Sequence, residues 1–297
     1  MGARLTRMQI ETLPHYRRKT SKEWSAACPA CGGRDRFLYW PETGNYWCRQ
    51  CDLKGFVEDG PRSWSAADRE QFMRMVAERA AQERAARKAA LDIMASKADR
   101  AAYYHHIMHD RSYWYSQGLT DETIDRYQLG WCPRCPTYPQ SPSWTIPVTF
   151  RSRLLNIRHR LASPPTPGDK YRPEMPGIGN VIFNADLFDQ HEKNPVLMVV
   201  EGEVKAMVLT QNGFPAVGIP GASSFKPAWA RWFEPFTEVI ICLDPGADKQ
   251  AERVAAIIGG KSRIATLPVK PDDFFVVHGG TPDSFQHWLR YGVPAGN

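Results

Sequence analysis

Two pairs of closely spaced cysteines constrain the fold of this 297-residue chain more than any other feature. Cys28 and Cys31 form one CxxC pair, and Cys48 and Cys51 form a second pair after sixteen intervening residues. Four thiolates at this separation match the spacing of a tetrahedral zinc site, and four protein ligands leave no open position for chemistry. The sequence therefore predicts a small zinc ribbon with a structural Zn(II).

Aromatic and basic side chains are interleaved around the cysteine pairs. They include Arg34, Arg36, Phe37, Tyr39, Trp40, Tyr46, Trp47, Arg49 and Lys54. Such a mixture suits single-stranded nucleic acid, because bases stack on rings while phosphates meet cations. The competing interpretation is that Phe37, Tyr39 and Trp47 form the core of a short metal-stapled module. We expect about half of the rings in that core, with Trp40 and the arginines as the better contact candidates.

Composition and local patterns suggest how the chain continues. The formal charge of +6 permits a nucleic-acid partner without requiring one. No apolar run is long enough for a membrane helix, and the amino terminus lacks a signal core, so we expect a cytoplasmic chain with reduced thiols and no membrane partner. Residues 65–99 contain strong helix formers and no Gly or Pro, which predicts a largely solvated connecting helix. Two short helices over 104–127 and a strand pair over 144–161 follow.

From residue 194 onward, apolar runs of strand length alternate with helical segments. Strands are expected at 196–202, 215–221, 238–244 and 262–268, with intervening helices at 203–213 and 247–260 and a partly helical link over 224–236. This alternation predicts a mainly parallel sheet covered on both faces. Ligands bind such sheets at the carboxyl ends of the strands.

Acidic side chains follow three of these predicted strands. Glu201 ends the first strand, Asp244 and Asp248 follow the third, and Asp272 comes after the fourth. Any one of these acids taken alone is best explained as a solvated helix cap. Together at one sheet edge they would repel one another unless a cation binds, and carboxylates suit Mg(II) or Mn(II). The set therefore predicts a divalent-metal site.

These segments resemble a known family. The strand-ending "EGE", then "LDPGAD" and "KPDD", is similar to the TOPRIM fold of DNA primases, topoisomerases and related nucleases. The ribbon with "CGGRDRF" and "WCRQC" resembles the template-reading zinc domain of phage- and plasmid-type primases. "YSQGLTDETIDRYQLGWCP" and "WTIPVTF…LLNIRHRL…GDKYRPEMPG" resemble the start of the primase RNA-polymerase domain and its basic subdomain. The matches follow the primase order over nearly the whole chain.

The resemblance to bacterial and phage-type primases implies a multidomain α/β chain. Its parts would be a zinc-ribbon domain over 1–62, a helical linker over 63–102, an α+β basic subdomain over 103–192 and a TOPRIM subdomain over 193–297. The implied reaction is the synthesis of short RNA primers on single-stranded DNA from nucleoside triphosphates, with a separate replicative helicase as partner. Two alternatives stay open, namely a metal-dependent TOPRIM nuclease and a non-catalytic module that binds single-stranded DNA.

The resemblance also implies roles for individual residues. Glu201, Asp244 and Asp272 would hold Mg(II) or Mn(II), with Glu201 as metal ligand or general base. Lys170 and Tyr171 would face nucleotide phosphates, together with Arg160 or Arg158 from the preceding strand. Lys205 and Asp248 are further candidates for binding at this site.

One position departs from the family pattern. Two residues after Asp244 the family usually has a second Asp, and this chain has Gly246. Either Asp248 substitutes for the missing acid, or the site holds one metal ion more weakly. A further pair, Cys132 and Cys135, has no second CxxC nearby, and with Cys242 it is interpreted as free thiols.

Overall fold

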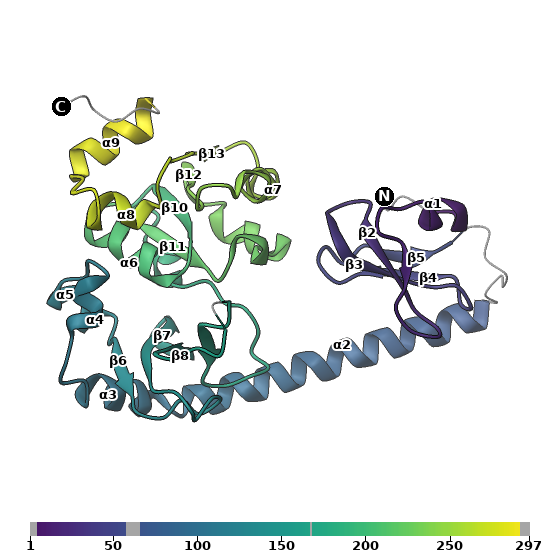
Figure 1. Ribbon diagram of the computed structural model, residues 1–297, viewed down its shortest axis with the longest axis horizontal. Coiled ribbons are helices and arrows are strands. Elements are labelled where there is room, and N and C mark those ends of the chain that lie inside the picture. The colour runs from purple at the N-terminus through teal and green to yellow at the C-terminus, as the bar shows by residue number, and fades with distance from the viewer. Residues whose placement is uncertain (1–4, 58–65, 167, 292–297) are drawn as a thin grey trace. The chain divides into compact units, whose positions relative to one another are not determined.

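The computed structural model describes residues 5–57, 66–166 and 168–291 and divides into two compact units, Met1–Ala81 and Gln82–Asn297 (Figure 1). The boundary falls inside the long helix α2 (Ala66–Ala95). The predicted long helix is thus present. Its described side chains are mostly exposed, as predicted, and it contacts the second unit's core near its carboxyl end, where Met94 is fully buried and Arg87 Nε donates to Ile178 O at 2.8 Å.

The first unit is built on a five-stranded antiparallel sheet. Its strands follow one another in chain order: β1 (Arg17–Arg18), β2 (Trp24–Cys28), β3 (Gly32–Trp40), β4 (Asn45–Cys48) and β5 (Lys54–Phe56). Helix α1 (Arg7–Glu11) precedes the sheet and begins with a capping box between Thr6 and Gln9. Its Ile10 is fully buried in the same core as the sheet, so this helix belongs to the ribbon module.

The core of this unit shows which of the ribbon's rings are buried. Phe37, Tyr39 and Tyr46 are buried, whereas Trp47, which was considered for the core, is 38% exposed. Side chains alternate along a strand, and Cys48 is buried with the core, so Tyr46 shares its face and Trp47 points the other way. The Trp47 indole donates to Asp52 Oδ1 at 2.8 Å. Trp47 is therefore a surface ring of the ribbon.

Short helices and a second antiparallel sheet open the second unit. The helices are α3 (Ala98–His106), α4 (Ser112–Ser116) and α5 (Asp121–Arg126). Thr120 caps α5 by accepting a hydrogen bond from Thr123 N, as its position predicted. The sheet has the order β6 (Gly130–Cys132), β7 (Ser143–Phe150), β8 (Arg153–Leu161) and β9 (Tyr171–Pro173). The predicted strand pair is confirmed as β7 and β8.

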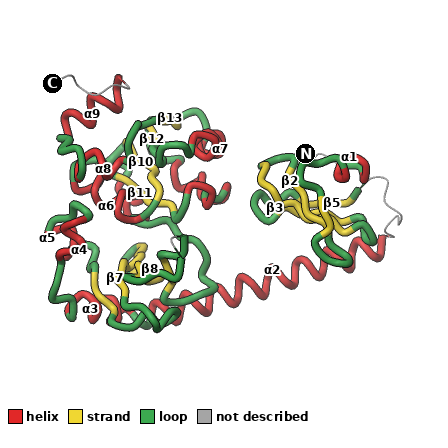
Figure 2. Tube along the Cα trace, viewed as in Figure 1, coloured by secondary structure: helices red, strands yellow, loops and turns green. Residues whose placement is uncertain are grey.

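A four-stranded parallel sheet follows, as predicted (Figure 2). Its order is β11 (Ala216–Ile219), β10 (Val196–Glu201), β12 (Glu238–Ile241) and β13 (Ser262–Ile264), and all three neighbouring pairs are parallel. The covering segments are η1 (Ala185–Gln190), α6 (Glu203–Gln211), η2 (Ala222–Ser224), η3 (Pro227–Phe233), α7 (Asp248–Ile258), α8 (Pro271–Val276) and α9 (Pro282–Tyr291).

Alternate residues of β10 serve the two faces of this sheet. Met198 and Val200 lie in the core that α6, α8 and α9 complete. Leu197 and Val199 lie in a second core with η1, η3 and α7. Burial on both faces explains the continuous apolar runs in the sequence, because neither face of a covered parallel sheet meets water.

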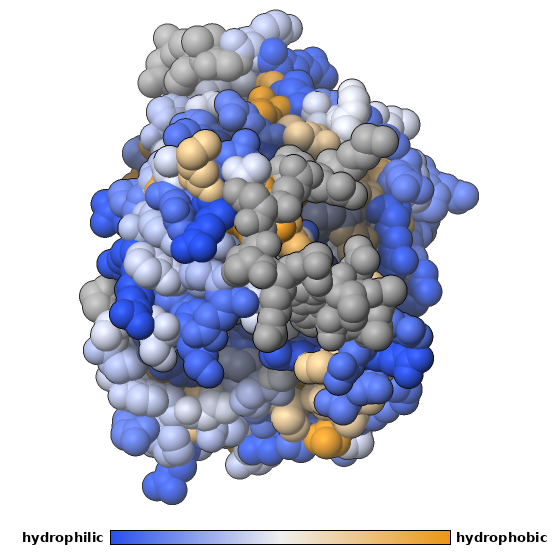
Figure 3. All heavy atoms as spheres, turned by 90° about the vertical axis from the view of Figure 1, so that its right-hand side faces the viewer, coloured by the Kyte–Doolittle hydropathy of each residue, from blue (hydrophilic) through white to orange (hydrophobic). Residues whose placement is uncertain are grey.

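The surface drawn in Figure 3 is mostly hydrophilic, with apolar residues in small separate patches. Among the described helices, none is both long enough and apolar enough to span a membrane. The apolar content of the described chain is instead concentrated in its buried clusters.

Candidate functional site

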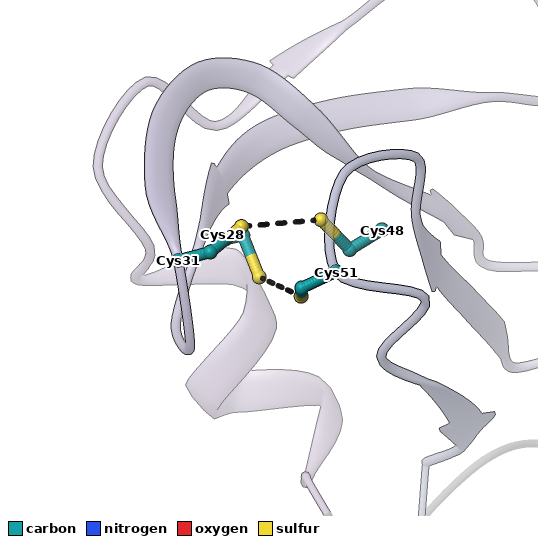
Figure 4. A group of neighbouring side chains, drawn as sticks. All are labelled: Cys28, Cys31, Cys48 and Cys51. Atoms are coloured by element: carbon teal, nitrogen blue, oxygen red, sulfur yellow. Dashed lines mark hydrogen bonds between the residues drawn. The ribbon is translucent and has the colours of Figure 1, made fainter. Parts of the chain in front are cut away.

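The four cysteines of the ribbon converge from two turns. Cys28 and Cys31 flank the turn between β2 and β3, and Cys48 and Cys51 follow one another at the end of β4 (Figure 4). The Sγ atoms of Cys28 and Cys51 are 3.6 Å apart, those of Cys31 and Cys48 are 3.5 Å apart, and all four lie within 4.8 Å of one another. Four sulfurs at the Zn–S distance of a tetrahedral site would be about 3.8 Å apart.

Backbone donors support the same interpretation. Ala30 N donates to Cys28 Sγ and Gln50 N donates to Cys48 Sγ, each at 3.4 Å. These N–H groups favour the thiolate form that binds metal. Burial raises the pKa of the Cys28 thiol to about 11 when no metal ion offsets it. The residues therefore fit a structural Zn(II), which would displace the thiol protons.

The candidate acidic residues lie at the topological switch point of the parallel sheet. The chain passes from β10 to β11 on one side, and later from β12 to β13 on the other. Glu201 is the last residue of β10, and Asp244 lies three residues after β12, its neighbour. Open parallel sheets bind ligands at this position. The predicted sheet-edge location of Glu201 and Asp244 is thus observed.

The turn after Asp244 explains why Gly occupies position 246. Ala247 N donates to Asp244 O at 3.1 Å, which closes a four-residue turn with Pro245 at its second position. Gly246 has φ +85°, and a type II turn favours Gly at this third position. An Asp at position 246 would be strained in this backbone. Asp248, the first residue of α7, is exposed and lines the same shallow hollow as Asp244.

Two carboxylate oxygens of this edge are buried without hydrogen-bond partners. They are Asp244 Oδ1 and Asp272 Oδ1, the latter from the first turn of α8. Lys205 Nζ lies 3.2 Å from Asp244 Oδ1, an ion-pair distance without hydrogen-bond alignment. Burial raises the pKa of Asp272, and the nearby charge of Lys205 opposes that shift.

Unpartnered buried carboxylate oxygens fit a divalent cation, because such oxygens are costly to leave unsatisfied. Among the described residues, however, the four cysteines are the one group of three or more Cys, His, Asp or Glu side chains close enough together to hold a metal ion. The assignment of Glu201, Asp244 and Asp272 to a metal stays a prediction.

A row of rings and one cation crosses the antiparallel sheet. Trp131, Trp144, Arg160 and Tyr171 stand directly opposite one another on β6, β7, β8 and β9. Tyr113 stacks on Trp144 with a centroid distance of 3.7 Å. Cross-strand neighbours share one face of a sheet, so this face combines apolar rings with a guanidinium.

Both predicted arginines lie over the Tyr171 ring. The guanidinium carbons of Arg158 and Arg160 are 5.2 and 5.7 Å from its centroid. Arg158 Nε also lies 3.2 Å from Oε1 of Glu203, which is 5% exposed at the start of α6. Arg160 donates to Leu161 O, and Lys170 is exposed immediately before β9. The ion pair therefore brings the basic face, meaning the face of the antiparallel sheet with Arg158 and Arg160, against the acidic edge, meaning the edge of the parallel sheet near Glu201.

Sequence reasoning missed three members of this arrangement. Glu203 was part of the quoted "EGE" but received no role, and Tyr113 and Trp144 were not considered. The two-residue periodicity of β7 and β8 could have placed Trp144 on the face of Arg158 and Arg160. Nothing local could have paired Glu203 with Arg158, because Glu203 lies in helix α6 and Arg158 in strand β8, 45 positions apart in the chain.

Comparisons with known proteins agree with both units. Residues 25–60 match the family described as the zinc-binding domain of primase-helicase. A DNA primase from Geobacillus stearothermophilus is 25% identical over 231 residues, which cover 60% of this chain and 38% of the relative. This chain therefore spans about two fifths of the length of that curated relative.

Two solved structures have a similar fold. One comprises the zinc-binding and RNA polymerase domains of the Aquifex aeolicus primase, with a TM-score of 0.53, 16% identity and coverage of 92% of this chain and 79% of that chain. The other is the DnaG primase catalytic domain bound to single-stranded DNA, with a TM-score of 0.54 and 20% identity. The match covers 72% of this chain and 83% of that chain. The comparisons confirm the primase resemblance drawn from the sequence and the predicted fold class.

Proposed function

We propose that this chain is a DNA primase that synthesises short RNA primers on single-stranded DNA by metal-dependent nucleotidyl transfer. The observation that carries this proposal is the Arg158–Glu203 ion pair. Glu203 lies two residues after Glu201, so the ion pair joins the basic face of the antiparallel sheet to the acidic edge of the parallel sheet. Nucleotidyl transfer needs cations for the phosphates and carboxylates for metal in one place, and this contact brings the strand of Arg158 and Arg160 next to the helix that follows Glu201.

Different residues bind the nucleotide and the metal ion in this proposal. Arg160 and the exposed Lys170 bind triphosphate oxygens, and the Tyr171 ring orients the Arg160 guanidinium. Glu201, Asp244 and Asp272 would hold Mg(II) or Mn(II), which when bound neutralises phosphate charge and activates the primer 3′-hydroxyl. The parallel sheet holds Glu201 at the end of β10 and Asp244 three residues after the neighbouring strand β12.

The zinc ribbon engages the template strand. Trp47 is exposed, Trp40 is half-buried, and Arg34, Arg36 and Arg49 come from the same module. Rings and cations on one small module suit single-stranded DNA. The binding of single-stranded DNA by a similar catalytic domain supports such a template for the second unit.

Functional segments follow from this proposal. Residues 1–62 form the zinc domain, 63–102 the helical linker, 103–192 the basic subdomain and 193–297 the TOPRIM subdomain. Nucleoside triphosphates are the substrates, and a separate replicative helicase supplies the unwound template.

A primer-synthesis assay tests the proposal. The zinc-loaded protein is incubated with random single-stranded templates, labelled nucleoside triphosphates and Mg(II), and the products are sequenced. We expect new oligonucleotides from the unaltered protein and at least a hundredfold fewer from Glu201→Gln, with DNA binding retained. The matched control is Glu252→Gln, which changes an exposed acid of α7 and leaves synthesis unchanged.

Three results would contradict the proposal. Shortened template without new oligonucleotides identifies a nuclease. DNA binding without synthesis or cleavage identifies a non-catalytic binding module. Full synthesis by Glu201→Gln removes the proposed site.

A further inference from the structure

We propose that the Lys205 ammonium is a built-in cation of the carboxylate edge, which stands in for a second divalent ion and limits the edge to one. This inference rests on the proposed function, because it concerns the metal requirement of the same site.

The position of Lys205 carries the inference. Lys205 is the third residue of α6, the helix that begins directly after Glu201 and Gly202. Its Nζ reaches Asp244, which follows the neighbouring strand β12, at 3.2 Å. The two side chains are only 14% and 25% exposed. The ammonium therefore lies at the switch point itself, held against a candidate metal ligand.

The local charge balance agrees with one divalent ion. Counting only the three candidate metal ligands and Lys205, Glu201, Asp244 and Asp272 carry three formal negative charges and Lys205 one positive charge, which leaves a net charge of minus two. One divalent cation neutralises this set, whereas two would leave an excess charge of plus two. Excess charge in a half-buried site is unfavourable because solvent screens it poorly.

The turn at Gly246 independently supports a single divalent ion at this edge. A second ion needs further carboxylate ligands, and the type II turn places Gly at this position. The next acid, Asp248, is exposed on α7. The edge thus has fewer acids and one more cation than a two-ion site requires.

A different role for Lys205 would be direct binding of a nucleotide phosphate. The contact with Asp244 places the ammonium where a metal ion would otherwise offset that carboxylate. The two roles are separated by measuring metal binding with no nucleotide present.

The test is a titration of the zinc-loaded, nucleotide-free full chain with Mn(II), followed by electron paramagnetic resonance. We expect Lys205→Met to bind a second Mn(II), or to bind the first about tenfold more tightly, because a positive charge close to the ion has been removed. Lys205→Arg keeps the charge and serves as the matched control, with the stoichiometry and affinity of the unaltered protein. Asp244→Asn, tested in the Lys205→Met background, should remove the gain.

A second measurement covers the case in which Lys205→Met is unstable. Without metal, that variant has unbalanced carboxylates, so we expect Mg(II) to raise its melting temperature more than that of the unaltered protein. Equal Mn(II) binding by the unaltered protein and Lys205→Met overturns the inference, including the case in which neither binds Mn(II). A melting temperature that Mg(II) does not raise further in Lys205→Met also counts against it.

These results are distinguishable from those for the proposed function. If the protein makes primers and its Mn(II) binding does not depend on Lys205, only the proposed role of Lys205 is rejected. A Lys205-dependent Mn(II) site in a protein that makes no primers supports the built-in cation and rejects the primase proposal.

Discussion

Arg158 Nε lies 3.2 Å from Glu203 Oε1, and this ion pair joins strand β8 of the antiparallel sheet to the first turn of α6 beside the parallel sheet. The side chains are 21% and 5% exposed. Removing one partner of such a pair leaves an uncompensated charge where water has little access. The contact therefore holds the basic face and the acidic edge in a fixed relation.

Arg158→Met should destabilise the protein by about 3 kcal/mol, because it leaves Glu203 buried without its partner. The double variant Arg158→Met/Glu203→Leu should recover most of this loss, since no charge then stays buried. Urea unfolding measures both values. Arg153→Met is the matched control: its ion pair with Asp92 is about half exposed, so its loss should be below about 1 kcal/mol. An equal loss of unfolding free energy in Arg158→Met and Arg153→Met would show that the buried ion pair stabilises the protein no more than the exposed one.

Zinc removal should unfold the ribbon and leave the second unit folded. The first unit has a small core, and the metal links its two turns, whereas the second unit has cores of its own. Zinc content and circular dichroism after chelation measure the effect. Cys31→Ala should bind less zinc, while Cys135→Ala, which alters a buried free thiol elsewhere, should keep the full amount. Loss of zinc from Cys135→Ala would place that residue in a metal site.

A buried histidine should make the stability of the second unit depend on pH. His159 is fully buried, 2.7 Å from Glu174 Oε2 and 2.9 Å from Ser143 Oγ. Burial alone would lower the pKa of His159, but interactions with the neighbouring Cys132 and Glu174 side chains outweigh it and raise the pKa. A raised folded-state pKa stabilises the protein fully below the unfolded value of about 6.5, and that contribution is lost as pH rises through the folded value.

Urea unfolding between pH 6 and 9 should therefore show falling stability in the unaltered protein. His159→Gln should be less stable at pH 6, with a flatter dependence on pH. His278→Gln, which alters an exposed histidine, is the control and should keep the slope of the unaltered protein. The same slope in His159→Gln would assign the pH dependence to another group.

Gly218→Ala should destabilise the protein by about 1–3 kcal/mol and lower primer synthesis. A Cβ at Gly218 would lie 2.5 Å from Gly202 O, a backbone atom in the turn directly after Glu201. The strands or that turn must move, which displaces the Glu201 carboxylate. Thermal unfolding and the primer assay measure the two effects. Gly260→Ala meets nothing within 4 Å and should change neither. Unchanged synthesis in Gly218→Ala would mean that the turn tolerates the displacement.

The cysteine cluster and the positions of Glu201 and Asp244 were predictable because short stretches of sequence determine them. The cysteine spacing predicted four clustered thiols because each pair occupies one turn and a short antiparallel sheet brings the turns together. Glu201 and Asp244 were predicted at one edge because parallel strands end on the same side of a sheet. The competing interpretation that placed Trp47 in the ribbon core is wrong, and the burial of the neighbouring Cys48 on the opposite face of the strand explains why.

The sequence by itself determined the zinc ribbon, the parallel sheet and the edge at which its acids gather, since spacing and periodicity act over a few residues. Only the tertiary structure decided that Arg158 pairs with Glu203 and that Lys205 reaches Asp244. These contacts join residues that lie about forty positions apart along the chain, on separate elements. Their distances depend on how sheets and helices pack, and no pattern of neighbouring residues encodes that packing.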